Sequence, residues 1–246
     1  MNWEQWQRSW DRQQEFYMPD REERFRVMLD LVEAAAGRAP RVLDLACGTA
    51  TISLRLFARL PDATSVGIDR DPALLRIAER SFEGDTRASF VTADLDTPDW
   101  IAALLDEPFD AVLTATATHW MTATPLARLY GDIVKLLRPG GIFLNADHMP
   151  EPANPLLNAL DETVQKAHRK QAGKAGALDW DRWWAAAAAD PQLAEDVAAS
   201  REILSRHDIG QEHPADWHLT RLREAGFLEA GVVWRSVTDA VIAAIR

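Results

Sequence analysis

The residues best placed to do chemistry form one short stretch, 41–50, which reads RVLDLACGTA. The apolar run 42–45 leads directly into small residues, and a helix-like pattern of apolar residues follows over 52–60. This order predicts a buried parallel strand, a tight turn and the N-terminus of a helix. Small side chains let a ligand approach the backbone, and the first amides of a helix are free to bind it. Taken alone, such a turn is compatible with any nucleotide-binding α/β fold.

Two carboxylates end the next two predicted strands. Asp69 closes the stretch SVGID and Asp94 closes FVTAD. A carboxylate in the position of Asp69 can accept hydrogen bonds from both hydroxyls of a ribose. The alternative for Asp69 is a helix cap, but Asp71 before Pro72 already suits that role. The alternative for Asp94 is a turn former. The turn lacks the G-x-G-x-x-G pattern of dinucleotide-binding folds.

The stretch DLACGTA, residues 44–50, resembles the first motif of the class I S-adenosylmethionine (SAM)-dependent methyltransferases, whose usual form is (D/E)xGxGxG. Only Gly48 of the three glycines is kept, and Ala46 and Ala50 replace the others. Alanine followed by cysteine is common at the first position in the DLACGTG branch of the family. Ala50 is the sharper departure, because a side chain there crowds the backbone beside the methionyl part of SAM and makes a positive φ unfavourable.

The resemblance implies that SAM is the cofactor. It implies that Asp69 binds the ribose, that Asp94 receives the adenine amino group, and that the backbone N–H of Leu95 reaches a ring nitrogen. In many relatives an N-terminal helix closes over SAM, and a tyrosine near its end contacts the methionyl group. The remaining cofactor contacts that the resemblance assigns are Tyr17, Asp44, Ala46, Gly48, Arg70 and Thr114.

A histidine and a tryptophan follow the predicted strand 109–115. Ligands of open α/β sheets bind at the carboxyl ends of the strands, so His119 and Trp120 should border the reaction centre. They resemble the segment after the fourth strand in small-molecule methyltransferases. His119 is either a general base that deprotonates an acceptor or a residue that bonds the backbone and shapes the pocket. Trp120 either faces the sulfonium, where an aromatic ring stabilises a cation by about 0.5–2 kcal/mol, or packs in the core. Of these two positions, we expect Trp120 to pack in the core.

His148 follows the predicted strand 141–147 and is placed near the substrate by the same rule. Neighbouring side chains of a strand point to opposite faces, so Asp147 is not expected to orient His148 directly. We treat His148 as a candidate for catalysis and substrate binding, with a structural role as the alternative.

The N-terminal segment is rich in aromatic residues. Trp3, Trp6 and Trp10 lie three and four residues apart, which places them on one face of a helix. Such a stripe is ordinarily packing. Trp10 is nevertheless a candidate for substrate binding, and Tyr17 is a candidate for catalysis as well as for the cofactor. Arg21, Arg24 and Arg26 include a candidate partner for a carboxylate, but we expect most of them to lie on a solvated helix surface.

The rest of the pattern predicts a Rossmann-like, seven-stranded α/β sheet of the class I methyltransferase type, with helices on both faces and a helical cap. The expected strands are 41–45, 64–68, 88–93, 109–115 and 141–147, followed by a C-terminal antiparallel pair. The expected helices are 20–36, 51–60, 72–83, 98–105, 124–137 and 214–225. The expected domains are an N-terminal helical lid (1–40), the SAM-binding core (41–149), a helical cap (150–212) and a C-terminal part that completes the core (213–246).

Composition limits the partners. The chain has 246 residues, 47% of them hydrophobic, and a formal net charge of −11 without a basic block, which disfavours nucleic acid. Cys47 is the only cysteine, which excludes an internal disulfide and fits a reducing compartment. The helix N-terminus is expected to lower the pKa of its thiol. No apolar stretch is long enough for a membrane span, and the N-terminus does not resemble a signal peptide, so we expect a cytoplasmic protein.

Three histidines lie close together in the sequence, at 207, 213 and 218, but without the usual companions of a metal site, so no metal is expected. The chain is expected to be a monomer or a homodimer formed through the cap.

These observations favour SAM-dependent methyl transfer to a small-molecule acceptor. Two alternatives stay open. The first is an enzyme of the same fold that uses SAM itself as the substrate, by cyclisation or cleavage that releases methylthioadenosine. The second is a module that binds SAM or a partner without catalysis.

Overall fold

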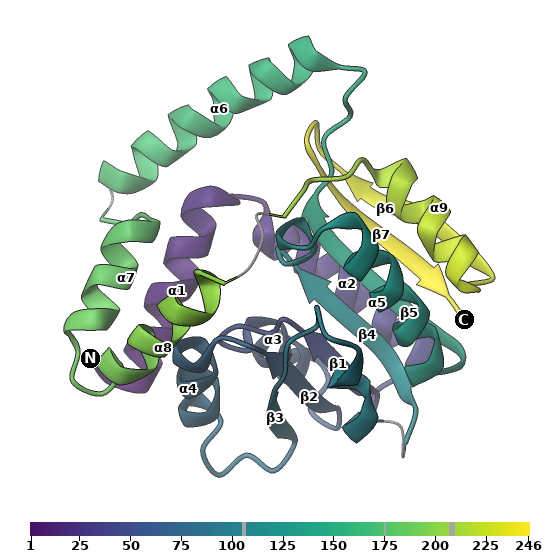
Figure 1. Cartoon of the computed structure of the whole chain (residues 1–246), viewed down its shortest axis with the longest axis horizontal. Helices are drawn as coiled ribbons and strands as arrows, with labels where there is room; N and C mark the ends of the chain where they lie inside the picture. The colour runs from purple at the N-terminus through teal and green to yellow at the C-terminus, as the bar shows by residue number, and fades with distance from the viewer. Residues whose placement is uncertain (105–106, 175, 207–209) are drawn as a thin grey trace.

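The computed structural model describes residues 1–104, 107–174, 176–206 and 210–246. Within these ranges, seven strands form one sheet in the order β3-β2-β1-β4-β5-β7-β6 (Figure 1). Strands β1 to β5 are parallel, and β7 is antiparallel to both of its neighbours. The predicted fold class is therefore confirmed. The strands are β1 Arg41–Leu45, β2 Thr64–Asp69, β3 Ala88–Thr92, β4 Phe109–Ala115, β5 Leu137–His148, β6 Glu229–Arg235 and β7 Asp239–Ile245.

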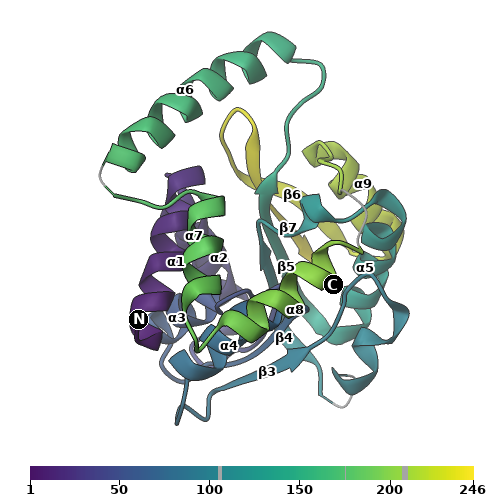
Figure 2. The same ribbon diagram turned by 60° about the vertical axis from the view of Figure 1, so that its left-hand side comes forward.

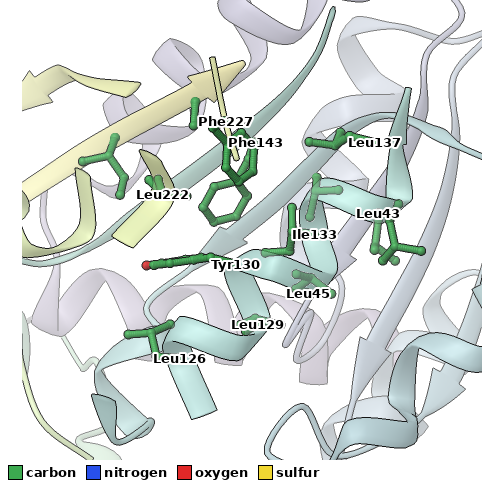
Figure 3. Packing of buried hydrophobic residues seen from close by; sticks show 14 of the residues in the cluster. Leu43, Leu45, Leu126, Leu129, Tyr130, Ile133, Leu137, Phe143, Leu222 and Phe227 are labelled. Carbon is green, nitrogen blue, oxygen red and sulfur yellow. The ribbon is translucent and has the colours of Figure 1, made fainter. Parts of the chain in front are cut away.

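Helices cover both faces of the sheet, because each face presents apolar side chains that must be buried. On one face α2 (Arg21–Ala36), α3 (Thr51–Arg59) and α4 (Pro72–Ser81) share a buried cluster with the strands. On the other face lie the 3-10 helix η1 (Pro98–Leu104), α5 (Ala123–Leu136) and α9 (Ala215–Ala225). Figure 3 shows the second cluster, in which Tyr130, Phe143 and Phe227 pack between α5, β5 and the C-terminal part of the chain.

The N-terminal helix and two helices of the cap form a further layer. Helix α1 (Trp3–Tyr17), α7 (Trp180–Ala189) and α8 (Ala194–Leu204) pack with α4 around a cluster of tryptophans. Trp183 is fully buried there, and its indole N–H donates to Ser9 Oγ at 3.0 Å. The aromatic stripe predicted for the N-terminal segment is therefore largely packing. Helix α6 (Pro155–Lys174) buries no residue and spans above the rest of the molecule (Figure 2).

Two expected elements differ in extent from what is observed. Residues 138–141, Arg-Pro-Gly-Gly, were expected to separate a helix from the fifth strand, but β5 begins at Leu137 and runs through them. The strand extends through these residues because they pair with both neighbouring segments. Leu137 pairs with Phe109 of β4, and Gly140 N donates to Arg246 O, just after β7, at 2.8 Å. The helix expected over 98–105 is the shorter η1, and residue 105 lies outside the described ranges.

Candidate active site

A cavity of about 650 Å³ lies at the carboxyl ends of the parallel strands. Every residue predicted to bind the cofactor or the acceptor lines it, although they come from α1, the ends of the five parallel strands and the loops that follow these strands. A volume of this size is typical of small-ligand sites, which range over roughly 300–1,000 Å³. The predicted residues are therefore brought together: Trp10, Tyr17, Asp44, Ala46, Gly48, Asp69, Arg70, Asp94, Leu95, Thr114, His119, Trp120 and His148.

The turn between β1 and α3 has left-handed backbone at three alternate residues. The φ angles are 51° at Ala46, 55° at Gly48 and 59° at Ala50. Ala50 thus adopts the positive φ that its side chain makes unfavourable. Its N–H donates to Cys47 O at 2.8 Å and its carbonyl accepts from Leu54 N at 3.1 Å, so the neighbouring hydrogen bonds hold it there. A left-handed L-residue is disfavoured by about 1–2 kcal/mol.

Ala46→Gly is expected to raise the free energy of unfolding by about 0.5–1 kcal/mol. Glycine removes the left-handed penalty of about 1–2 kcal/mol, and its greater freedom in the unfolded chain offsets about 0.4–1 kcal/mol of that gain. Ala46 is half-buried, whereas the methyl of Ala50 is fully buried and its loss would cancel the benefit. Urea unfolding followed by tryptophan fluorescence measures the change. The matched variant Ala78→Gly, in the regular helix α4, should instead lower the free energy of unfolding by about 1 kcal/mol or more. A destabilised Ala46→Gly protein would contradict the argument.

Asp69 joins the turn to the end of β2. Its carboxylate accepts from Gly48 N at 2.7 Å and from Asp71 N at 2.9 Å. A carboxylate has about four acceptor positions, so these two bonds do not exhaust its capacity to accept from a ligand in the cavity. Burial raises the pKa of Asp69 to about 6, against the lowering effect of these backbone donors. Asp71 caps α4 by accepting from the N–H groups of Ala73 and Leu74, as predicted.

Asp44 and Cys47 lie deeper in the same turn. Asp44 is almost fully buried and accepts from Ser53 Oγ at 2.9 Å, and its burial raises the pKa to about 7. The expectation for Cys47 is wrong in sign: burial, and then the nearby charges of Asp44 and Asp69, raise the pKa of its thiol well above the ordinary value. The thiol is a small filler there, because its Sγ lies 2.9 Å from the place that a Cβ on Gly67 would occupy.

Charged residues form the rim beyond β2 and β3. Arg70 Nη1 lies 3.5 Å from Asp94 Oδ1 and 3.3 Å from Asp96 Oδ2. Arg70 therefore pairs with the carboxylate predicted to receive adenine, which fixes the position of that carboxylate. On the opposite wall, Thr114 Oγ1 donates to Leu45 O at 2.9 Å and ties β4 to β1.

The N-terminal helix closes one side of the cavity. The hydroxyl of Tyr17 accepts from Trp180 N at 3.0 Å, so Tyr17 joins the end of α1 to the start of α7. The indole nitrogen of Trp10 lies 4.0 Å from the place that a Cβ on Gly48 would occupy, which puts this ring beside the cofactor turn. Trp184, which was not among the predicted binding residues, also lines the cavity. Its buried indole N–H has no hydrogen-bond partner among the described residues, so it is a donor available to a ligand.

His119 is paired with a buried carboxylate. Its Nδ1 lies 2.6 Å from Asp147 Oδ1, while Asp147 Oδ2 accepts from Thr118 Oγ1 at 2.5 Å and from His119 N at 3.1 Å. Burial opposes ionisation of Asp147, but the charge and hydrogen bond of His119 keep its pKa well below the usual range. The ring of His119 is therefore held by a carboxylate through Nδ1, and both alternatives for its role remain predictions.

His148 has a carboxylate of its own from a distant part of the chain. Its Nδ1 contacts Asp239 Oδ1 on β7, and Asp239 Oδ2 lies 2.9 Å from Arg24 Nη2 on α2. Asp147 does not bond the ring of His148, as predicted, although it accepts from the backbone N–H of His148 at 2.8 Å. Burial would lower the pKa of His148, but Asp239 raises it overall.

Two predictions about side-chain exposure are wrong. Trp120 is 50% exposed at the cavity, so it is not a core residue; the 3-10 turn η2 (Thr118–Trp120) points it outward, 5.2 Å from the His119 ring. Arg21 and Arg24 are buried rather than solvated, because each pairs with a carboxylate, Asp11 and Asp239 respectively, whereas Arg26 is exposed.

Sequence reasoning missed Asp147 and Asp239 as the partners of the two histidines, and it named Arg24 as a candidate carboxylate partner without placing it near His148. One signal was present: Asp147 follows Ala146, which pairs with Ala115, so the ends of β4 and β5 had to lie side by side.

In the described part of the chain, no three His, Cys, Asp or Glu side chains gather to hold a metal ion. His213 stacks on Trp217 and His218 bonds Tyr130, away from the cavity lining, and residue 207 lies outside the described ranges. No helix in these ranges is long and apolar enough to cross a membrane.

The residues present fit SAM. Asp69, the acidic side chain predicted to bind the ribose, lines the cavity together with the Gly48 turn and with Trp184, whose buried indole N–H lacks a partner among the described residues. Asp94 and Leu95 also line the cavity. They follow β3, which pairs directly with β2, the strand that Asp69 ends.

Comparison with known proteins agrees with this geometry. A family model described as a methyltransferase domain matches residues 42–141. Trans-aconitate 2-methyltransferase from Methylobacterium radiotolerans is 31% identical over 197 residues, which are 76% of this chain and 63% of the relative. The enzyme of the same name from Methylobacterium nodulans is 31% identical over 189 residues, 73% of this chain and 68% of the relative. This chain thus spans about two thirds of the length of each.

Solved structures share the fold at low sequence identity. An O-methyltransferase family protein from Burkholderia thailandensis superposes with a TM-score of 0.58 at 19% identity, covering 89% of this chain and 55% of that one. Human N-acetylserotonin methyltransferase in complex with SAM superposes with a TM-score of 0.55 at 17% identity, covering 90% and 51%. The chain belongs to the class I SAM-dependent methyltransferases, and its cofactor is SAM.

Proposed function

We propose that this protein transfers the methyl group of SAM to a hydroxyl oxygen of a small molecule. The observation that carries the proposal is the pairing of His119 Nδ1 with the buried Asp147 at 2.6 Å, on the wall of the cavity that holds the cofactor residues. A ring whose Nδ1–H is held by a carboxylate presents its other nitrogen, Nε2, as a proton acceptor.

Each part of the site has a task in this reaction. SAM, when bound, supplies a methyl carbon that is already activated by a positively charged sulfur. His119 Nε2 takes the proton of the acceptor hydroxyl as its oxygen forms the new bond to carbon, and Asp147 stabilises the imidazolium that results. The tryptophans of α1 and α7 close the cavity against water. Alignment and proton removal are therefore the contributions of this chain.

The relatives named trans-aconitate 2-methyltransferase point to a different acceptor group. A carboxylate has already lost its proton near neutral pH and needs no base. Methylation of a carboxylate would leave the His119–Asp147 pair without a task, which is why a hydroxyl acceptor is the better proposal. An intramolecular reaction of SAM alone would leave the pair idle in the same way.

Mass spectrometry tests the proposal. The protein is incubated with SAM that carries a deuterated methyl group, first alone and then with hydroxylated aromatic compounds or trans-aconitate. A labelled ether formed by the native protein and lost in His119→Gln is the expected result. Methylthioadenosine above the no-protein control would show that SAM is the sole substrate. A labelled ester of trans-aconitate, formed equally by His119→Gln, would overturn the hydroxyl acceptor and the base.

The affinity for S-adenosylhomocysteine (SAH) is expected to fall as the pH drops below about 6. Burial raises the pKa of Asp69 to about 6, so this carboxylate is ionised at neutral pH and takes up a proton in that window. A protonated carboxyl loses acceptor capacity for the ribose hydroxyls, and one such group weakens binding by at most about tenfold per pH unit. Calorimetry between about pH 5 and pH 7.5 measures the effect. Asp69→Asn should bind weakly at every pH and show a flatter profile; an unchanged slope in this variant would assign the titration to another group, such as Asp44.

A further inference from the structure

Two histidines face the same cavity from neighbouring segments. The ring centroids of His119 and His148 are 5.4 Å apart, and both rings line the cavity. Each ring has its Nδ1 against a separate buried carboxylate, Asp147 for His119 and Asp239 for His148. Each therefore has only Nε2 left for a ligand. The two imidazole rings thus lie together in the cavity lining, and methyl transfer to one hydroxyl uses only the first.

The charged groups around His148 come from four elements. Asp239 on β7 bonds its Nδ1, and Asp147 on β5 accepts from its backbone N–H. Arg24 on α2 lies behind Asp239 and also pairs with Asp20 at 2.8 Å, while His119 in η2 faces the ring. The two carboxylates nearest the ring favour its protonated form, and Arg24 opposes them from one layer further back. A protonated His148 would present Nε2–H as a donor, whereas His119 must be neutral to act as a base.

The wall beside His119 is aromatic, and aromatic side chains line other parts of the same cavity. Trp120, half exposed, lies against the His119 ring, and other aromatic residues of the cavity lining are Trp10, Tyr17, Phe25, Trp180 and Trp184. A cavity with flat apolar walls and two neighbouring imidazole rings is suited to a flat apolar ligand that carries two polar atoms at one edge.

We propose that His148, positioned by Asp239, is a second acceptor-binding group, and that the acceptor is an aromatic compound with its reactive hydroxyl next to a second oxygen. The inference rests on the proposed function, because the second oxygen is defined as the neighbour of the hydroxyl that is methylated in that reaction. The reactive hydroxyl donates to His119 Nε2, and the neighbouring oxygen accepts from His148 Nε2–H. On transfer, the oxygen–carbon bond forms, the carbon–sulfur bond breaks with its electron pair staying on sulfur, and the hydroxyl proton passes to His119. His148 keeps its proton throughout.

Two isomers test this assignment. The probes 1,2-dihydroxybenzene and 1,4-dihydroxybenzene carry the same groups and differ only in whether the oxygens are adjacent. Binding to the SAH-loaded protein is measured by tryptophan fluorescence, and methyl transfer from SAM by mass spectrometry. The 1,2-isomer is expected to bind about 10-fold to 100-fold more tightly, the range for a hydrogen bond to a charged group. Equal binding of the isomers, or no binding of either while SAH binds normally, overturns the assignment.

Variants separate this proposal from the proposed function. His148→Gln should remove the preference for the 1,2-isomer and raise its KM about tenfold or more, with kcat changed much less. In Asp239→Asn, the preference for the 1,2-isomer should be absent at about pH 8 and should return at about pH 6. The reason is that His148 without its carboxylate is protonated only at lower pH. A merely structural role for Asp239 would not produce that recovery. His168→Gln, on the exposed helix α6, is the matched control. Methyl transfer that continues with no isomer preference in the native protein would leave the proposed function standing and sink the role of His148.

Discussion

Replacing His119 by glutamine is expected to lower kcat about 100-fold to 10,000-fold while the affinity for SAH stays within about twofold. A positioned general base contributes roughly that factor, and glutamine cannot take the proton of a hydroxyl. Most of the predicted cofactor residues lie at the ends of β1, β2 and β3 or in the loops that follow them, whereas His119 belongs to the turn after β4, so removal of its ring should leave most SAH contacts in place. The measurement is single-turnover methyl transfer to the acceptor found by mass spectrometry, with SAH binding followed by calorimetry.

Asp147→Asn is the companion variant. The amide keeps the size of the carboxylate but no longer stabilises a charged imidazolium, so kcat should again fall by a large factor. Thr118 and the backbone N–H of His119 also bond this carboxylate, so thermal unfolding is measured in parallel to detect a loss of structure. Full activity of either variant in a folded protein would show that the acceptor needs no base, as expected for a carboxylate.

The cofactor half of the site could be predicted from sequence because its residues lie at the ends of consecutive strands. The motif at 44–50 and the carboxylates Asp69 and Asp94 occupy successive strand–turn units, and the order of these units in the chain follows their order in the sheet. Once the strands were identified, their carboxyl ends had to meet at one edge. His119 and His148 were placed at the cavity by the same reasoning, since His119 follows β4 and His148 ends β5.

The groups that orient the histidines depend on longer-range packing. Asp239 is 91 residues from His148 and reaches it only because β7 inserts antiparallel beside β5, where His148 pairs with Asp239 in the register. Arg24 comes from a helix at the opposite end of the chain and is buried because its charge is matched there. A sequence shows Arg24 as one more charged residue of a helix. The exposure of Trp120 has the same origin, because it depends on where the short η2 turn points and not on hydrophobicity.

Trp183→Ala is expected to lower the free energy of unfolding by about 3–5 kcal/mol, the usual range for truncating a buried tryptophan. Trp183 is fully buried at the junction of α1 and α7, with ring centroids 5.5 Å from Trp6 and 4.8 Å from Trp10. Its N–H donates to Ser9 Oγ, which the substitution leaves without this donor. Urea unfolding measures the loss, and hydrogen exchange shows whether α7 opens before the sheet does.

The position of Trp183 also connects stability to the site. Trp10 contacts Trp183 on one side and lies beside Gly48 on the other, so a loosened α1 exposes the cofactor turn to water. Trp183→Ala should therefore weaken SAH binding, although Trp183 itself does not line the cavity. Trp180→Ala is the matched control, since Trp180 lies on the same helix and contacts Trp10 but is 36% exposed. It should destabilise the fold much less. If Trp183→Ala unfolds like the native protein, α7 does not hold the N-terminal helix over the cofactor, and the tryptophan cluster has no part in closing the site.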